Sequence, residues 1–166
     1  MFYYSLASAM SIRVATFQGM KDWLRLERSA RAGRDILLAV AVVASFVFYF
    51  FGPSLIGFFT KDAAVIQMAV MLIPGLIFYQ YADAMQICYA NALRGTAYVK
   101  PMAPIALVAY LCIGIPVGYL LGFIVDWKLN GLFLGLPAGL FTAAALFYYY
   151  FRKAMKRNLQ APEGGA

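Results

Sequence analysis

Asp83 is the one acidic residue inside a long hydrophobic stretch of the sequence. The next charge, Arg94, follows 11 residues later, and the pair Lys61 and Asp62 precedes it by about 21 residues. Along a helix that rises ~1.5 Å per residue, these charges lie roughly 16 Å and roughly 31 Å from Asp83. Because the hydrocarbon core of a bilayer is ~30 Å thick, Asp83 is expected near its middle. An ionisable group is costly at that depth, which favours a role in binding or relaying a charged ligand.

The polar residues around Asp83 lie on one side of the predicted helix. At ~100° per residue, Tyr79, Asp83 and Gln86 fall within an arc of ~60°. Gln80 and Asn91 widen this arc to ~140°, and the rest of the circumference is apolar. We predict that Asp83 and Tyr79 bind a cation and that the other three residues line the same cavity. The alternative is a helix–helix hydrogen-bond seam, in which Gln or Tyr partners hold Asp83 neutral.

The composition indicates an integral membrane protein built of helices. The sequence has 166 residues, of which 64% are hydrophobic and 13% are charged. Its hydrophobic runs are too long and too unbroken for the alternating strands of a barrel, so we predict an all-α bundle of membrane-spanning helices. The sequence has no histidine, which excludes a histidine-based metal site or catalytic triad. Cys88 and Cys112 lack metal-site spacing and are interpreted as small packing residues.

Five hydrophobic segments predict helices in the membrane. Their predicted bounds are 1–19, 36–59, 64–93, 102–125 and 129–151. The first segment contains Arg13 and is short for a full crossing, so it is interpreted as the cytoplasmic end of a span whose start is missing or short. Residues 152–166 are expected to form a polar cytoplasmic tail.

The basic residues indicate how these segments are oriented. Two of them, Lys61 and Lys128, lie at one set of segment ends, and eleven lie at the other. The eleven are Lys21, Arg25, Arg28, Arg31, Arg34, Arg94, Lys100, Arg152, Lys153, Lys156 and Arg157. The positive-inside rule therefore predicts that the richer ends and the C-terminus are cytoplasmic, and the net charge of +7 does not indicate a nucleic acid partner. Lys21–Arg34 is interpreted as a basic interfacial loop, with specific lipid or nucleotide binding as the alternative.

Prolines and glycines mark irregular points and close contacts in these helices. Pro53, Pro74 and Pro116 are expected to bend or loosen them, because proline removes a backbone donor. Two stripes of glycine recur every four residues, one at Gly114, Gly118 and Gly122 and the other at Gly131, Gly135 and Gly139. Each stripe lacks side chains, so we expect a neighbouring helix to approach it closely.

Five stretches of the sequence, taken in order, resemble a known family. They read SIRVATFQG, LIGFFTKDAAVIQMA, YQYADAMQICYANALRG, GIPVGYLLGF and GLFLGLPAGL. The set resembles the C-terminal lobe of bacterial multidrug and toxic compound extrusion (MATE) transporters, from about residue 5 to about residue 151. The most specific part is the pattern YQxxDAxQxxxxxxLRG around Asp83.

The resemblance implies a fold and a site. Members of that family have twelve helices in two six-helix lobes that face each other across a central cavity. This chain looks like the last five helices, beginning partway into the eighth. In the family, the tenth helix carries an aspartate at the cation site, and Asp83 matches it; Tyr79 matches a tyrosine that lines the same site. Two features depart from the family pattern. The family's seventh helix, which supplies a partner glutamate, has no counterpart here, and the family motif that usually reads RVG is Arg13-Val14-Ala15 in this sequence.

The function that the resemblance implies is part of a secondary active antiporter in the plasma membrane of a bacterium. It would export cationic drugs or toxic organic compounds in exchange for Na⁺ or H⁺, and no cofactor beyond that coupling ion is expected. Its expected partners are membrane lipid, small cationic substrates, and the N-terminal lobe and preceding helices of the same transporter.

Two alternatives to the antiporter remain open. A lipid-linked sugar flippase of the same superfamily would more often line its cavity with several cations, and a non-transporting assembly subunit would need a partner for its glycine stripes. An intramembrane enzyme is not expected, because the sequence lacks a histidine base, a GxSxG elbow and paired acids.

Overall fold

The computed structural model describes residues 2–125 and 127–160, and this part of the chain is helical apart from short turns. Its elements are α1 (Phe2–Gly19), α2 (Trp23–Phe59), α3 (Ala63–Gly95), α4 (Met102–Leu107), η1 (Val108–Gly114), α5 (Ile115–Tyr119), η2 (Leu120–Ile124) and α6 (Lys128–Gln160). The four elements from α4 to η2 follow one another without a break, and we call this continuous helix, Met102–Ile124, the rod. The segments η1 and η2 of the rod are π-helical.

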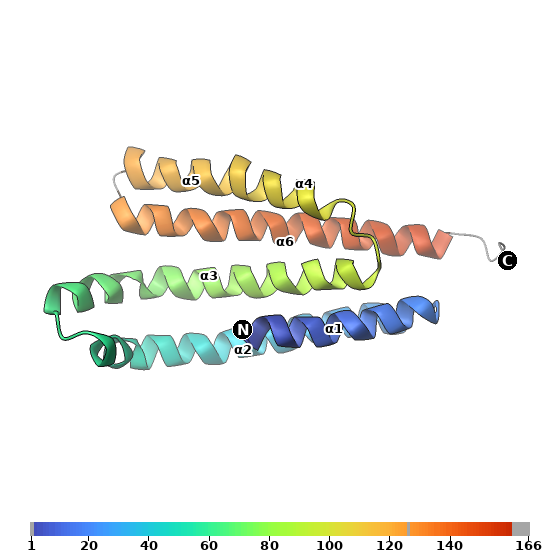
Figure 1. The fold of residues 1–166 in the computed structure, drawn as a ribbon, viewed down its shortest axis with the longest axis horizontal. Helices are drawn as coiled ribbons and strands as arrows, with labels where there is room; N and C mark the ends of the chain where they lie inside the picture. The colour runs from blue at the N-terminus through green and yellow to red at the C-terminus, as the bar shows by residue number, and fades with distance from the viewer. Residues whose placement is uncertain (1, 126, 161–166) are drawn as a thin grey trace.

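The helices lie side by side, with α3 in the centre (Figure 1). α3 packs against α1 and α2 on one side and against α6 on the other, and the rod packs on the far side of α6. α1 reaches only about halfway along the bundle, whereas α2, α3 and α6 run its length. The site described below lies where α3, α6 and the rod come together.

Four helices in the described part of the chain are long and apolar enough to cross a membrane. They are Trp23–Phe59, Ala63–Gly95, Met102–Ile124 and Phe133–Arg157. Large hydrophobic side chains are exposed on their outer surfaces, as lipid-facing helices require. This is a multi-pass, all-helical membrane protein. α1, the segment predicted to be short for a full crossing, is not among the four.

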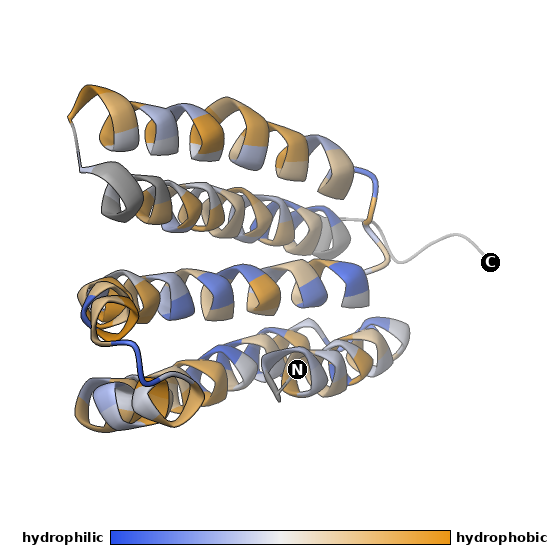
Figure 2. Cartoon of the chain, turned by 60° about the vertical axis from the view of Figure 1, so that its left-hand side comes forward, coloured by the Kyte–Doolittle hydropathy of each residue, from blue (hydrophilic) through white to orange (hydrophobic). Residues whose placement is uncertain are grey.

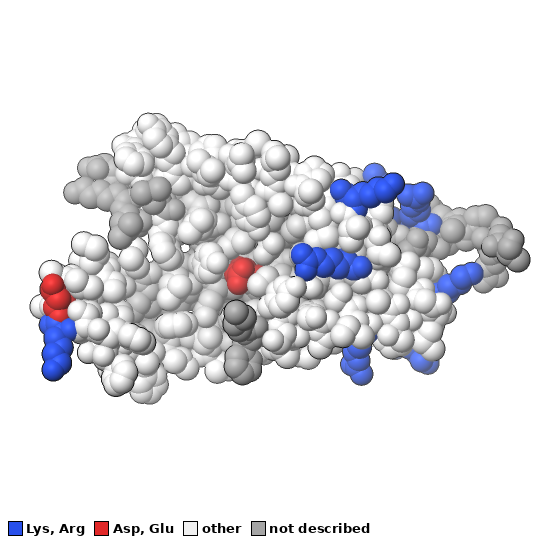
Figure 3. Space-filling view, viewed as in Figure 1, with Lys and Arg blue, Asp and Glu red and all other residues white. Residues whose placement is uncertain are grey.

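The basic side chains gather toward one end of the bundle (Figure 3). The α1–α2 turn, the α3–α4 turn and the end of α6 lie at this end, and the α2–α3 turn lies at the opposite end (Figure 1). Lys21 and Ala97, in the two turns at the basic end, have φ angles of 55° and 56°. This left-handed backbone ends α1 and α3 and reverses the chain.

Two helices extend beyond the predicted segments. Lys21–Arg34 is not a loop, because α2 begins at Trp23, where the Asp22 carboxylate accepts a hydrogen bond of 3.0 Å from the backbone N–H of Arg25. The segment stays helical because its charges pair along the helix, as Arg31 does with Glu27 at 2.8 Å. The predicted tail at 152–166 is helical as far as Gln160, because α6 continues past the expected membrane surface. Residues 161–166 lie outside the described residues.

Prolines coincide with irregular helical segments. Pro53 lies near the end of α2 and Pro74 lies in α3. Figure 2 shows the last turns of α2 and the first turns of α3 out of line with the remainder of each helix. In the rod, the N–H of Ile115 donates to the carbonyl of Tyr110, five residues back. This wider turn immediately precedes Pro116 and makes room for its ring.

Candidate functional site

The site depends on how closely α6 approaches the rod. The two predicted glycine stripes face each other across this interface. A Cβ atom built on Gly135 would overlap Gly118 Cα and lie 2.9 Å from the carbonyl oxygen of Gly114. Such an atom on Gly139 would lie 3.2 Å from Gly114 Cα. The backbones are therefore in direct contact, as small-residue stripes allow between membrane helices. The sequence predicted close approach at each stripe but not that each is the other's partner.

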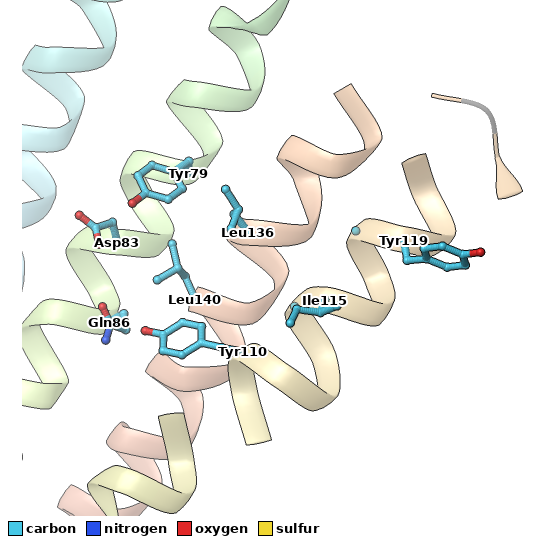
Figure 4. Close-up of a pocket in the computed structure, with 10 residues that line it drawn as sticks. Tyr79, Asp83, Gln86, Tyr110, Ile115, Tyr119, Leu136 and Leu140 are labelled. Carbon is cyan, nitrogen blue, oxygen red and sulfur yellow. The ribbon is translucent and has the colours of Figure 1, made fainter. Parts of the chain in front are cut away.

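A cavity of about 640 Å³ opens between this interface and α3. It is lined by Tyr79, Asp83, Gln86, Tyr110, Gly114, Ile115, Gly118, Tyr119, Leu136 and Leu140. Figure 4 shows Tyr79, Asp83 and Gln86 on α3, opposite Leu136 and Leu140 of α6 and Tyr110 of the rod. Its volume is in the range of pockets that hold small organic molecules. Asp83 is the only ionisable acid or base among these lining residues apart from the tyrosine hydroxyls.

The carboxylate of Asp83 is available to a ligand. Asp83 is partly buried, and no ion pair or hydrogen bond joins its side chain to another described residue. Tyr79 of α3 and Tyr110 of η1 line the same cavity as Asp83, and Tyr3 of α1 lies within electrostatic reach of its carboxylate. A cation at this position would meet a carboxylate, phenolic oxygens and aromatic rings, all of which attract positive charge.

The described residues do not form the hydrogen-bond seam around Asp83 that was the alternative to a cation site. In that alternative, Gln or Tyr side chains would donate to the carboxylate and hold it neutral. Tyr79, Gln86 and Tyr110 line the same cavity as Asp83, yet none of them makes a hydrogen bond to it. The polar side chains therefore surround an open space rather than closing a contact between helices.

The structure brings three of the five predicted site residues together and leaves two apart. Tyr79, Asp83 and Gln86 share the cavity, whereas Gln80 and Asn91 are not among its lining residues. Asn91 is buried, and its Nδ2 donates to the carbonyl of Ile87 in the same helix at 2.9 Å. The Oε1 atom of Gln80 is buried without a hydrogen bond.

Helical geometry explains the separation of the two groups. Measured around α3 from Asp83, Tyr79 and Gln86 lie ~40–60° to one side, and Gln80 and Asn91 lie ~60–80° to the other. The second direction leads toward α1 and α2, because Cys88, ~140° from Asp83 on that side, contacts Met10 of α1. An arc of ~140° is too wide for all five side chains to face one cavity.

The sequence argument missed the residues that other helices contribute. Tyr110, Leu136 and Leu140 complete the walls, and their positions depend on which helix packs on which. A signal for Tyr110 was present, because it precedes Gly114 by four residues and therefore lies on the same face as the glycine stripe. No comparable signal marked Tyr3, whose hydroxyl is buried without a hydrogen-bond partner.

The described residues do not form a conventional metal centre. No group of three or more His, Cys, Asp or Glu side chains comes together among them. What the cavity offers instead is one carboxylate in an apolar, aromatic enclosure. That combination suits a monovalent ion, a proton or an organic cation that uses the same carboxylate.

Comparisons with known proteins agree with this fold. The model of the MatE family matches residues 1–120. A protein of Bacillus cereus named "Probable multidrug resistance protein NorM" is 34% identical over 157 residues, covering 94% of this chain and 35% of its own length. A protein of the same name from Xanthomonas campestris is 32% identical over 152 residues, covering 92% of this chain and 33% of its own. The chain thus spans about a third of the length of the curated relatives it matches.

Two solved structures have the same arrangement of helices. One is the inward-facing conformation of a multidrug resistance MATE family transporter of the MOP superfamily, with a TM-score of 0.83 and 13% identity over 93% of this chain and 36% of that one. The other is the eukaryotic MATE transporter AtDTX14, with a TM-score of 0.79 and 23% identity over 94% of this chain and 37% of that one. At these identities the likeness shows the fold.

Proposed function

This chain belongs to the MatE family, and from that membership we propose that it forms part of an antiporter that exports organic cations in exchange for Na⁺ or H⁺. The observation that carries the proposal is the position of Asp83. Its carboxylate lies midway along a spanning helix, in a cavity of about 640 Å³, with no ion pair to another described residue. A carboxylate is costly there unless a positive ligand compensates it.

Competition for Asp83 supplies the proposed coupling. The carboxylate holds either the coupling ion or a cationic substrate, so binding of one favours release of the other. Tyr79 offers a phenolic oxygen to Na⁺ and an aromatic face to an organic cation. The apolar walls made by Ile115, Leu136 and Leu140 suit the hydrophobic body of an amphipathic drug. None of these steps requires nucleophilic or redox chemistry from the chain, so we propose a transporter and not an enzyme.

The proposed setting follows from the charges and the relatives. The ends rich in Lys and Arg, including the end of α6, would face the cytoplasm of a bacterium. Because the matched relatives are about three times as long, the proposed partners are the helices that correspond to the remaining two thirds of such a transporter. Membrane lipid would cover the exposed apolar surface.

The described cavity does not favour the flippase alternative. A lipid-linked sugar carries phosphate, so its cavity needs cationic side chains to bind that charge. The lining residues of this cavity include no Lys or Arg, and the one charged group is an acid. This charge repels a phosphate and attracts a cation.

Substitution of Asp83 tests the proposed function. The chain would replace the corresponding third of the Bacillus cereus relative, and the hybrid would be expressed in bacteria that lack their own drug pumps. We expect resistance to a cationic dye, and we expect Asp83→Asn to lower it to the level of cells without the hybrid, because Asn cannot carry the exchanged charge.

The matched control for this test is Asp62→Asn. Asp62 caps α3 at the opposite end from the basic residues, with its Oδ1 accepting from the backbone N–H of Ala64 at 2.9 Å. Asn caps helices about as well as Asp, so resistance should persist. Full resistance in Asp83→Asn at equal membrane expression would remove Asp83 from the coupling role. Dye efflux from vesicles energised by a Na⁺ gradient or a pH gradient alone would then identify the coupling ion.

A further inference from the structure

A second hollow lies between α1 and α2, away from the Asp83 cavity. Its volume is about 460 Å³. It shares no lining residue with the Asp83 cavity, and we call it the α1–α2 groove. The residues that matter below are Leu6, Met10 and Arg13 of α1 and Arg28, Ser29 and Ile36 of α2.

The groove is charged at one end and apolar at the other. α1 and α2 are joined by a short turn at the basic end, so they run antiparallel. Arg13 and Arg28 lie nearer that turn than Leu6 and Ile36 do on their respective helices. Leu6 is seven residues, roughly 10 Å, deeper than Arg13, and Ile36 is eight residues, roughly 12 Å, deeper than Arg28. The polarity therefore changes along the membrane normal, as it does in a phospholipid.

The two arginines of the groove lack counterions in the described structure. Neighbouring arginines are paired: Arg25 with Asp22 at 3.1 Å, and both Arg31 and Arg152 with Glu27 at 2.8 Å. Neither Arg13 nor Arg28 makes an ion pair or hydrogen bond with a described residue. Two unpaired guanidinium groups at one end of a groove whose other end is apolar suit the binding of one anion that has a hydrophobic body.

We propose that the α1–α2 groove binds an anionic phospholipid of the cytoplasmic leaflet, with its phosphate between Arg13 and Arg28 and an acyl chain along Leu6, Met10 and Ile36. Guanidinium groups bind phosphate oxygens through paired N–H donors, and Ser29 adds a hydroxyl at the same level. A free phosphate or nucleotide would not use the apolar half of the groove. The inference does not depend on transport through the Asp83 cavity.

Lipid binding by the purified full chain tests the proposal. Binding of phosphatidylglycerol and of phosphatidylcholine would be measured in detergent micelles by native mass spectrometry, each alone and in competition. We expect preferential binding of phosphatidylglycerol, and a loss on the order of tenfold or more in the double variant Arg13→Gln/Arg28→Gln. The matched control is Arg94→Gln/Arg157→Gln, which removes two exposed basic residues at the same end of the bundle but outside the groove.

A second pair of variants tests the apolar half without changing charge. Leu6→Gln/Ile36→Gln should weaken phosphatidylglycerol binding, whereas Val43→Gln/Leu111→Gln, at exposed positions on α2 and the rod, should not. Inorganic phosphate should fail to displace the lipid. Equal binding of the two lipids by the unaltered chain, an equal loss in both arginine variants, or displacement by inorganic phosphate would each overturn the proposal.

Discussion

Two helix interfaces in this molecule pack in different ways, one through side chains and the other through backbone atoms. Between α1, α2 and α3, buried side chains such as Leu26, Leu37 and Leu93 fill the space. Between α6 and the rod, the backbones of the two glycine stripes meet directly. In lipid, where burial of apolar surface drives helix association weakly, both arrangements work through close packing.

The difference determines what each interface can tolerate. A side chain at the first interface can turn to another rotamer when its neighbour grows. A helical backbone at the second interface has no alternative rotamer, so an added atom there must displace the whole helix. The cavity around Asp83 is bordered by Gly114 and Gly118 of this rigid interface, which therefore sets its shape.

Gly135→Val is the strongest test of this comparison. A Cβ at residue 135 would overlap Gly118 Cα and lie 2.6 Å from Gly118 N, and both are backbone atoms of a helix. We expect destabilisation of about 3 kcal/mol or more, at the upper end of the range for overpacking, because neither helix can relax locally. Thermal unfolding of the purified chain in detergent measures it.

Gly57→Val is the control for that substitution. Gly57 lies inside α2, and no atom outside its local helix lies within 4 Å of a Cβ built there. The two variants share the same change in helix propensity, so their difference isolates the contact with the rod. Equal unfolding temperatures would mean that backbone contact does not hold α6 to the rod.

Gly95→Ala tests whether the interface among α1, α2 and α3 also contains a contact that cannot relax. The added Cβ would lie 2.8 Å from the backbone oxygen of Ser11 and 2.7 Å from Cγ1 of Val14, which is fully buried. We expect an intermediate loss of about 1–3 kcal/mol, since α1 is short and can shift. The same unfolding assay measures it, with Gly19→Ala as the control, because the space around Gly19 is open. A loss as large as that of Gly135→Val would erase the distinction between the interfaces.

Glu27→Gln should have the smallest effect of the three. Glu27 joins α2 to α6 by accepting from Arg31 and Arg152, each at 2.8 Å, but its side chain is 26% exposed. Partly exposed ion pairs contribute about 1 kcal/mol or less, and salt screens them. We expect a small fall in the unfolding temperature at low salt that disappears at high salt. Asp22→Asn serves as a comparison confined to one helix, and a salt-independent fall in Glu27→Gln would show that the loss is not electrostatic.

Much of the architecture was predictable because it depends on local properties of the chain. Hydrophobic runs long enough to span a bilayer, separated by charged turns, predict the helices, and the Lys and Arg residues predict which ends lie together. The boundaries at Trp23 and Gln160 were missed, because helices that extend beyond the membrane into water have no hydrophobic signal there. The family motif RVG reads Arg13-Val14-Ala15 in this chain. Ala15 is exposed, whereas Val14 is buried against Gly95, so the glycine at this close contact is the one in the LRG motif.

Part of the candidate site was also predictable from local spacing, and part of it depends on how the helices pack. Asp83, Tyr79 and Gln86 are neighbours on one helix, so their spacing alone places them on one face. Gln80 and Asn91 belong to the edge of the same polar arc, and only the packing of α1 and α2 on that side of α3 separates them from the cavity. Tyr110 and Tyr3 come from other helices, whose positions no local pattern specifies.

The amino-acid sequence by itself determined a helical membrane protein. It also predicts an orientation and one carboxylate at mid-depth, because these follow from the positions of charges along the chain and from the cost of charge in lipid. Only the tertiary structure decided that the two glycine stripes meet each other, which tyrosines surround Asp83, and that Arg13 and Arg28 share a groove. Those arrangements join residues far apart in the chain, and they depend on which surfaces fit together at contact distance.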